Sequence, residues 1–292
     1  MAPGIDHVVH AVRDLEAAAA LYRRLGFTVG ARNVHPPSWG THNRIVQFPG
    51  TFVELLAVAD SSQTVPHSQG HFSFGAFNRD FLARGEGLSM LALQGTDEAA
   101  DCAERYRELG IGDFTPFHFQ RAARRPDGSS ATVAFSLAFA CDPAAPDIGF
   151  FACRHHHPEN FWDAAYQAHP NTAAGVAGVV LVAENPSDHH IFLSAFTGER
   201  ELRATSSGIS LKTARGEIEV VTPAALADRF GAAPPDLARG ARLAAVRFSL
   251  REPAKARAAL QSAQCGARER LGRIVVPPEA AMGATLVFEP AG

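Results

Sequence analysis

The chain has 292 residues, of which 46% are hydrophobic and 20% are charged, and its formal net charge is -3. A length of this size is typical of two domains. The composition is that of a globular protein, and the weak negative charge lacks the basic field that favours nucleic acid, so we expect no nucleic-acid partner. No stretch of the sequence approaches the roughly 20 consecutive apolar residues that span a bilayer, and we expect no membrane partner.

The four cysteines are scattered along the chain and form no CxxC pair; they are Cys102, Cys141, Cys153 and Cys265. This distribution is typical of free thiols in a reducing compartment, and we interpret each cysteine as a packing residue. The sequence also shows no secretory signal pattern. We therefore expect a cytoplasmic protein.

A recurring pattern begins at residue 5. Residues 5–12 are β-branched with a period of two, which predicts a strand. Asp14 then stands at a favourable helix N-cap position, and Gly26 stands where that helix is expected to end. The segments RIVQF and TFVELLAV, which follow, are rich in β-branched and apolar residues and predict further strands.

The order of strand, helix and about three strands recurs four times along the chain. The copies begin near residues 5, 88, 176 and 243. This spacing exceeds that of solenoid repeats, so each copy is half of a domain. The sheet face that no helix covers must be covered in another way, and pairing two units into a cup does this. We expect an α+β fold of four βαβββ modules paired into two cupped half-barrel domains, 1–160 and 174–292, with the boundary near 157–174.

Several stretches of the chain resemble glyoxalase-like members of the vicinal oxygen chelate superfamily. In the opening module the resemblance rests on IDHVVHAVRDLEAAAALYRRLGF, WGTHNRIVQF and TFVELLAV. Further along the chain it extends to FFACRHHHPENFW, HPNTA, VVLVAENP and GEIEVVTP. The resemblance implies paired modules and a cupped site that holds a divalent metal on strand side chains. It also implies a substrate whose oxygens bind that metal.

The resemblance places metal ligands at His7 on the first strand and at Glu54 on the last strand of the first module. The residue chemistry agrees, because Glu54 interrupts an apolar strand and a buried carboxylate needs a cation. The alternatives are that Glu54 pairs with an arginine such as Arg44 and that His7 is a hydrogen-bonded core histidine. Histidine and carboxylate ligands suit Zn, Mn, Fe or Ni.

A divalent site needs a third ligand, and the matching first strand of the second module offers only Ser89 or Met90. This departure disfavours the usual glyoxalase I site. The last strand of the second module instead runs into His155, His156 and His157. Because alternate residues of a strand face the same side, either His155 with His157 or His156 alone would face the site. We take His155 and His156 as candidate ligands, with a solvated histidine run as the alternative.

Four further residues are candidates for lining a substrate pocket: His35, Trp39, Asn43 and Trp162. The first three belong to HPPSWGTHN, a Pro- and Gly-containing connection of the kind on which binding residues concentrate. For the two tryptophans, plain packing is the alternative.

The second half of the chain is poor in ligands. At the position of His7, its two units have Gly178 and about Ala245, although Glu219 and Glu289 fall where Glu54 does. Ring-cleaving extradiol dioxygenases of this superfamily are expected to carry histidine at both first-strand positions, so the comparison disfavours that activity. We expect the metal in the first cup.

Taken together, the sequence predicts a metal-dependent glyoxalase-like enzyme that acts on a small oxygenated metabolite, with Glu54 as a ligand or as the catalytic base. Isomerase, lyase and hydrolase chemistry are all compatible with such a site. One alternative is a protein that binds or sequesters a small molecule without turnover, and another is a scaffold whose second domain mediates assembly. The expected partner is a small-molecule substrate, and the sequence also allows a homodimer.

Overall fold

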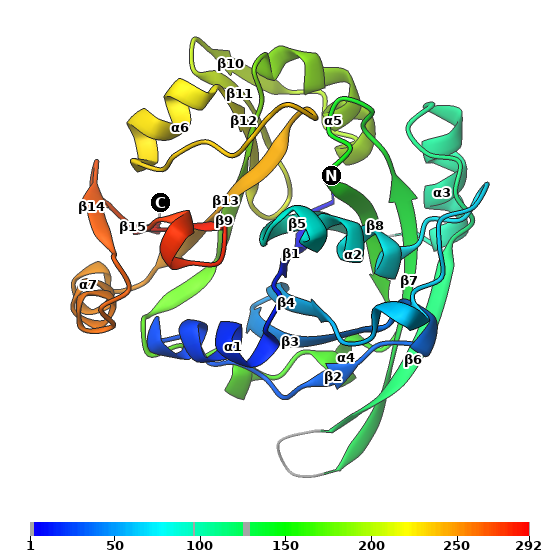
Figure 1. Ribbon diagram of the computed structural model, residues 1–292, viewed down its shortest axis with the longest axis horizontal. Helices are drawn as coiled ribbons and strands as arrows, with labels where there is room; N and C mark the ends of the chain where they lie inside the picture. Colours follow the sequence, from blue (N-terminus) through cyan, green and yellow to red (C-terminus); the bar gives the residue numbers. More distant parts are fainter. Residues whose placement is uncertain (1–2, 96, 125–128, 292) are drawn as a thin grey trace.

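The computed structural model describes residues 3–95, 97–124 and 129–291 and contains two eight-stranded mixed sheets, the first on the right and the second on the left of Figure 1. The first sheet has, in spatial order, the strands β2 (Asn33–Val34), β3 (Thr41–Phe48), β4 (Thr51–Val58), β1 (Ile5–Ala11), β5 (Gly87–Gln94), β8 (Gly149–His155), β7 (Ser130–Ala140) and β6 (Phe117–Arg124).

The second sheet repeats this order with the second half of the chain. Its strands are, in spatial order, β10 (Leu202–Thr205), β11 (Gly208–Lys212), β12 (Glu217–Val221), β9 (Ala173–Val182), β13 (Arg242–Leu250), β16 (Thr285–Pro290), β15 (Arg273–Val276) and β14 (Arg268–Arg270). Each unit contributes one helix after its first strand: α1 (Leu15–Arg24), α3 (Ala99–Glu108), α5 (His190–Thr197) and α7 (Pro253–Ser262). The predicted α+β fold of four βαβββ modules is confirmed.

Two units join into each sheet through their first strands. In the first sheet β1 pairs antiparallel with β5, while each first strand pairs in parallel with the last strand of its own unit, β4 or β8. The second sheet has the same pairing around β9 and β13. The last strand of every unit therefore lies near the middle of a sheet, where its side chains are buried.

Local sequence explains why the first helix begins and ends where it does. The Asp14 side chain accepts hydrogen bonds from the backbone N–H groups of Glu16 and Ala17, which is the predicted N-cap. Gly26 follows the helix with φ of 82°, in the left-handed region that favours glycine. A Cβ atom at Gly26 would also lie 2.9 Å from the Cβ atom of Asn171, so this turn has no room for a side chain.

The two sheets share one core. Residues of α1, of the helix-bearing face of the first sheet and of the second sheet form a single buried cluster. Within it the ring of Phe27 lies 5.0 Å from that of Phe248 and 5.7 Å from that of Phe288. The opposite, cupped faces have separate clusters, so each sheet encloses its own cup.

Three helices lie outside the four-unit pattern: α2 (Phe74–Arg84), α4 (Pro158–Phe161) and α6 (Pro223–Phe230). The sequence analysis did not predict them. α2 packs at the cup of the first sheet, where the buried Asn78 accepts a hydrogen bond from Ser89 and donates one to the backbone of Phe74. Across the described part of the chain, no helix has the length and apolar character needed to cross a membrane.

The stretch between the two sheets is bound tightly to the first one. Gln47 on β3 donates a hydrogen bond to the carbonyl of Phe161 at 2.8 Å and accepts one from the backbone of Asp163 at 3.1 Å. His169 accepts a hydrogen bond from the Thr28 N–H through Nδ1, and its Nε2 donates to the Gln47 carbonyl. This stretch therefore lies as a fixed strap along the edge of the first cup.

The His169 contacts predict a pH dependence of stability. Burial lowers the pKa of His169 to about 4 from 6.5, against the opposing effect of the Gln47 carbonyl. Protonation would place a hydrogen on Nδ1, which already accepts from Thr28. The neutral ring therefore contributes stability that is complete above pH 6.5 and is lost as the pH falls toward 4.

We expect the free energy of unfolding in urea to fall between pH 7 and pH 5 by about 1–2 kcal/mol more in the wild type than in His169→Gln. Other buried histidines titrate in both proteins, so the difference between them isolates His169. An identical pH dependence in the two proteins would contradict the proposed role of this contact.

Candidate functional site

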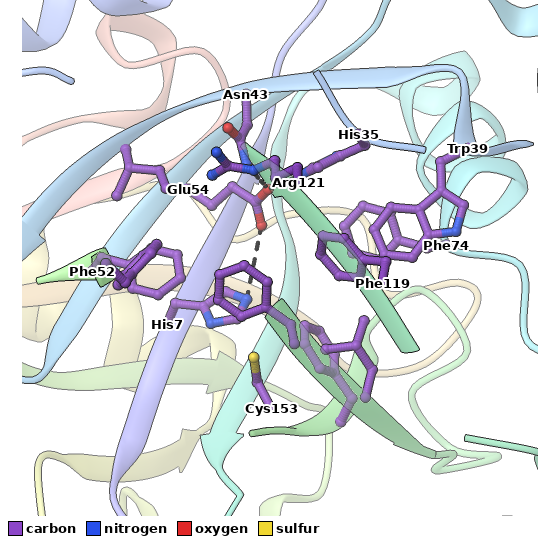
Figure 2. A pocket seen from close by; sticks show the side chains of 15 residues that line it. His7, His35, Trp39, Asn43, Phe52, Glu54, Phe74, Phe119, Arg121 and Cys153 are labelled. Carbon is purple, nitrogen blue, oxygen red and sulfur yellow. Dashed lines mark hydrogen bonds and ion pairs between the residues drawn. The ribbon is translucent and has the colours of Figure 1, made fainter. Parts of the chain in front are cut away.

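The cup of the first sheet contains a cavity of about 40 Å³. Its walls are mostly aromatic and apolar, and Figure 2 shows the side chains that line it. Six of the lining residues carry polar or ionisable groups: His7, His35, Asn43, Glu54, Arg121 and Cys153. A cluster of such groups against apolar walls is the usual character of a ligand site.

A bulge in β1 places two ionisable residues together. The pairing of β1 with β5 shifts register between Ile5 and His7, so Asp6 is the extra residue. Asp6 is only 1% exposed, and its carboxylate accepts hydrogen bonds from Nδ1 of His7 at 2.6 Å and from Nε2 of His155 at 3.1 Å. Burial alone would raise the pKa of Asp6, but the charge and hydrogen bond of His155, with those of His7, outweigh it and lower that pKa.

Glu54 faces the same cavity from the neighbouring strand. β1 and β4 run parallel, and Nε2 of His7 lies 3.8 Å from a carboxylate oxygen of Glu54, the contact drawn as a dashed line in Figure 2. The prediction that these two residues lie on adjacent strands and face one cavity is confirmed. Arg44 instead pairs with Glu16 at 2.9 Å, so it is not the partner of Glu54.

The environment of Glu54 favours its protonated form. Burial raises the pKa of Glu54, against the opposing charges of His7 and Arg121 and a hydrogen bond from Asn43. That bond joins Asn43 Nδ2 to one carboxylate oxygen at 2.6 Å. The other oxygen, the one nearer His7, accepts no hydrogen bond from the described residues and is directed into the cavity.

The loop before β3 brings the predicted pocket residues to this cavity. His35 donates from Nδ1 to the Thr41 hydroxyl at 2.8 Å, and its Nε2 accepts from Asn43 at 3.0 Å. Burial, followed by the charge of Arg121, lowers the pKa of His35 to about 3, so its ring is neutral. Trp39 stacks on Phe74 at 4.3 Å, where it lines the cavity.

The three adjacent histidines separate onto different surfaces. His155 faces the cup and stacks on Trp162 at 5.5 Å. His156 lies on the opposite face of the sheet, where its Nε2 lies 2.7 Å from the Ser136 hydroxyl and its ring lies 5.1 Å from that of His118. His157 precedes α4 and lies 3.6 Å from Glu159 at the surface. Alternation thus brings His155 to the site and places His156 on the opposite face. His157 is away from the site because the strand ends at His155.

A group of three donors in the first cup fits a divalent metal ion. One ligand atom each of Asp6, Cys153 and His155 lies within 4.8 Å of the other two. The Nδ1 atom of His155 is buried and has no hydrogen-bond partner among the described residues. Burial, with the nearby charges of Asp6 and Glu54, raises the pKa of Cys153 well above its usual value. Oxygen, sulfur and nitrogen donors together suit Zn or a similar borderline ion.

Three residues of the site are not among those expected from the sequence: Asp6, Cys153 and Arg121. Cys153 precedes His155 by two residues in a strand, so the same alternation would have placed it on the cup face. Arg121 alternates with two phenylalanines of β6 in the same way. Asp6 faces the cup only because β1 contains a bulge, which the residue pattern does not show.

The second cup contains no comparable group among the described residues. Glu219 matches Glu54 in register, but it pairs with Arg247 and with Arg229. Glu289 lies two residues beyond the matching position, which Val287 occupies, because β13 pairs Arg247 with Val287 and Ser249 with Glu289. It pairs with Arg247 at 2.7 Å and with Arg273 at 2.8 Å. Arginine side chains therefore neutralise both carboxylates.

Solved structures share this fold. A hypothetical protein from Staphylococcus aureus superposes with a TM-score of 0.65 at 11% identity over 99% of each chain. A mutant 4-hydroxymandelate synthase from Streptomyces coelicolor gives 0.56 at 12% identity, over 99% of this chain and 92% of the other. A fusion of a xylose isomerase-like TIM barrel with 4-hydroxyphenylpyruvate dioxygenase gives 0.52 at 14% identity, over all of this chain and 49% of the other.

The sequence comparisons give the family. No curated protein matches the chain. The family profile described as a glyoxalase-like domain matches residues 5–197, which is more than half of the chain and includes every residue of the first cup discussed above. This match identifies the chain as a member of the glyoxalase-like domain family.

Proposed function

We propose that this protein is a metal-dependent glyoxalase-like enzyme that acts on a small oxygenated metabolite. The observation that carries the proposal is the buried group of Asp6, Cys153 and His155, whose ligand atoms lie within 4.8 Å of one another beside the Glu54 carboxylate. A buried set of this kind is costly unless a cation or protons compensate its charge. Perturbed ionisable groups gathered in one cup also support a functional site over a packing role.

Asp6, Cys153 and His155 would hold the ion, with His7 beside them. The His7 ring is oriented by its bond to Asp6, as carboxylates commonly orient histidines of metal sites, and its Nε2 lies 3.8 Å from a carboxylate oxygen of Glu54. A bound divalent ion supplies polarisation of the substrate oxygens and stabilisation of the negative charge that develops on them. The donor set suits Zn best among Zn, Mn, Fe and Ni.

Glu54 is the proposed catalytic base. Its raised pKa suits a group that accepts a proton from carbon, and its free oxygen faces the cavity. Asn43 holds the other oxygen and so orients the carboxylate. His35, neutral and bonded to Asn43, fixes that amide in turn. Proton removal from a carbon next to a carbonyl would serve isomerase or lyase chemistry.

We assign this activity to a first domain at 1–160 and a structural role to a second domain at 174–292. The paired carboxylates of the second cup support this division, since arginines already occupy their charges. The four cysteines are free thiols, which supports a reducing compartment such as the cytoplasm.

Metal content tests the donor set. We expect the purified wild type to contain about one equivalent of a divalent metal by elemental analysis, and His155→Ala to lose most of it. His156→Ala is the matched control, because it removes the neighbouring ring from the opposite face and should retain the metal. Retention of metal by His155→Ala, or a metal-free wild type prepared without chelators, would contradict the proposed site.

Glu54→Gln tests the base. The amide keeps the shape of the side chain and an oxygen that accepts from Asn43, so we expect the fold and the metal content to remain. Exchange of substrate C–H hydrogen in deuterated buffer, followed by NMR over a panel of 2-hydroxyketones and 2-oxo acids, should slow by about 100-fold or more.

Two other results of this experiment would change the role assigned to Glu54 or to the whole protein. Loss of metal from Glu54→Gln would make Glu54 a ligand, for which its 3.8 Å separation from His7 is suitable, and would remove it as the base. Saturable binding by the wild type with no exchange or turnover of any panel member would favour a sequestering protein over an enzyme.

A further inference from the structure

Arg121 occupies the border between the catalytic cavity and a larger outer one. It is the third inward residue on β6, after Phe117 and Phe119, and it lines both the inner cavity of about 40 Å³ and a neighbouring cavity of about 370 Å³. Ile45 and Phe161 are the other residues common to the two walls. A molecule that extends from the outer cavity toward Glu54 would therefore pass the Arg121 guanidinium, which Figure 2 shows near Asn43 and Glu54.

Among the described residues, the Arg121 guanidinium group has no matched anion. Its one hydrogen bond to the described residues is a long one, 3.4 Å, from Nη1 to the carbonyl of Ala122, and none of their carboxylates forms an ion pair with it. By contrast, Arg247 in the second cup contacts three glutamates. Glu54 affects Arg121 only through its field, and burial is the main reason that the Arg121 pKa is lowered.

A partly buried cation without a partner is unfavourable, so an arginine in this position indicates an anionic ligand. The planar guanidinium group presents paired N–H donors that match both oxygens of a carboxylate. We propose that Arg121 binds the carboxylate of an organic acid substrate and positions its oxygenated end toward Glu54. This inference deepens the proposed function, on which it rests, by giving the substrate class.

The volumes of the two cavities indicate which part of the substrate each one can hold. A cavity of about 40 Å³ holds roughly three water molecules and is too small for an aromatic ring, which needs on the order of 150 Å³. The inner cavity therefore accepts only the small oxygenated end of the acid. The outer cavity is lined by Phe161, Trp162 and Tyr166, whose rings suit an aromatic or apolar body.

Ligand binding can be measured with benzoate and with benzyl alcohol, its neutral counterpart. Trp39 and Trp162 are the only tryptophans of the chain, and each lines one of the two cavities, so intrinsic fluorescence reports on both. The wild type, as purified and after chelator treatment, should bind benzoate more tightly than benzyl alcohol. Arg121→Met should weaken benzoate binding about tenfold or more and leave benzyl alcohol binding nearly unchanged.

Two further variants are controls for charge and folding. Arg121→Lys keeps the charge without the planar fork, so its benzoate affinity should lie between those of the wild type and Arg121→Met. Arg23→Met makes the same change of net charge on α1, away from both cavities, and should bind benzoate as the wild type does.

The metal content of the same samples separates the two proposals. Benzoate binding that depends on Arg121 in a wild type that already lacks metal as purified without chelators would sustain the organic-acid site while overturning the metal-dependent function. Equal binding of benzoate by the wild type and a folded Arg121→Met variant, or no preference of the wild type for benzoate over benzyl alcohol, would overturn the role of Arg121 whatever the metal content.

Discussion

The arrangement of the first cup depends on one buried carboxylate, that of Asp6. A charge removed from water needs partners, and Asp6 receives two, from His7 on its own strand and from His155 on β8. Each histidine donates a hydrogen bond to Asp6 from one ring nitrogen, so the other nitrogen of each ring can make a different contact. For His7 that nitrogen faces Glu54, and for His155 it is a buried atom that has no hydrogen-bond partner in the described part of the chain. The bulge in β1 is what lets one residue orient both rings.

The two cups show two solutions to the same electrostatic problem. Glu219 occupies in the second cup the place of Glu54 in the first, and arginine side chains surround it. Arg247 contacts Glu219 from β13, where it pairs with Gly178 of β9. Gly178 occupies the position that His7 has in the first cup, and it has no side chain that could donate. Complete ion pairing stabilises a fold and leaves no group free for chemistry. In the first cup, by contrast, Glu54 has a raised pKa and Arg121 forms no ion pair with the described residues, and perturbed ionisable groups of this kind are typical of binding sites.

The fold could be predicted from the sequence because its signals are local and repeated, since the order of an apolar strand, a helix and further strands recurs in every unit. His7 and Glu54 could be placed because the family resemblance assigns a histidine to the first strand and a glutamate to the last strand of a module. Strand alternation reduced the histidine run to two choices, His155 with His157 or His156 alone. Asp6 could not be placed, since a bulge reverses that alternation without a sequence signal. Arg121 could not be identified from the sequence for another reason. It stands out only because it is largely buried and forms no ion pair with the described residues, and both facts depend on the folded structure. Alternation also could not choose between His155 and His156 until the strand's pairing was known.

The strap between the two sheets has two structural roles. Residues 158–171 join one sheet to the other, and the same residues supply Phe161 and Trp162 to the cavity walls and are held to β3 through Gln47. The second half of the chain is thus anchored at the rim of the first half's pocket. Separating the two halves would therefore disturb residues that line the pocket, namely Phe161 and Trp162. Among the described residues, the second half contains no group of donors that could hold a metal ion.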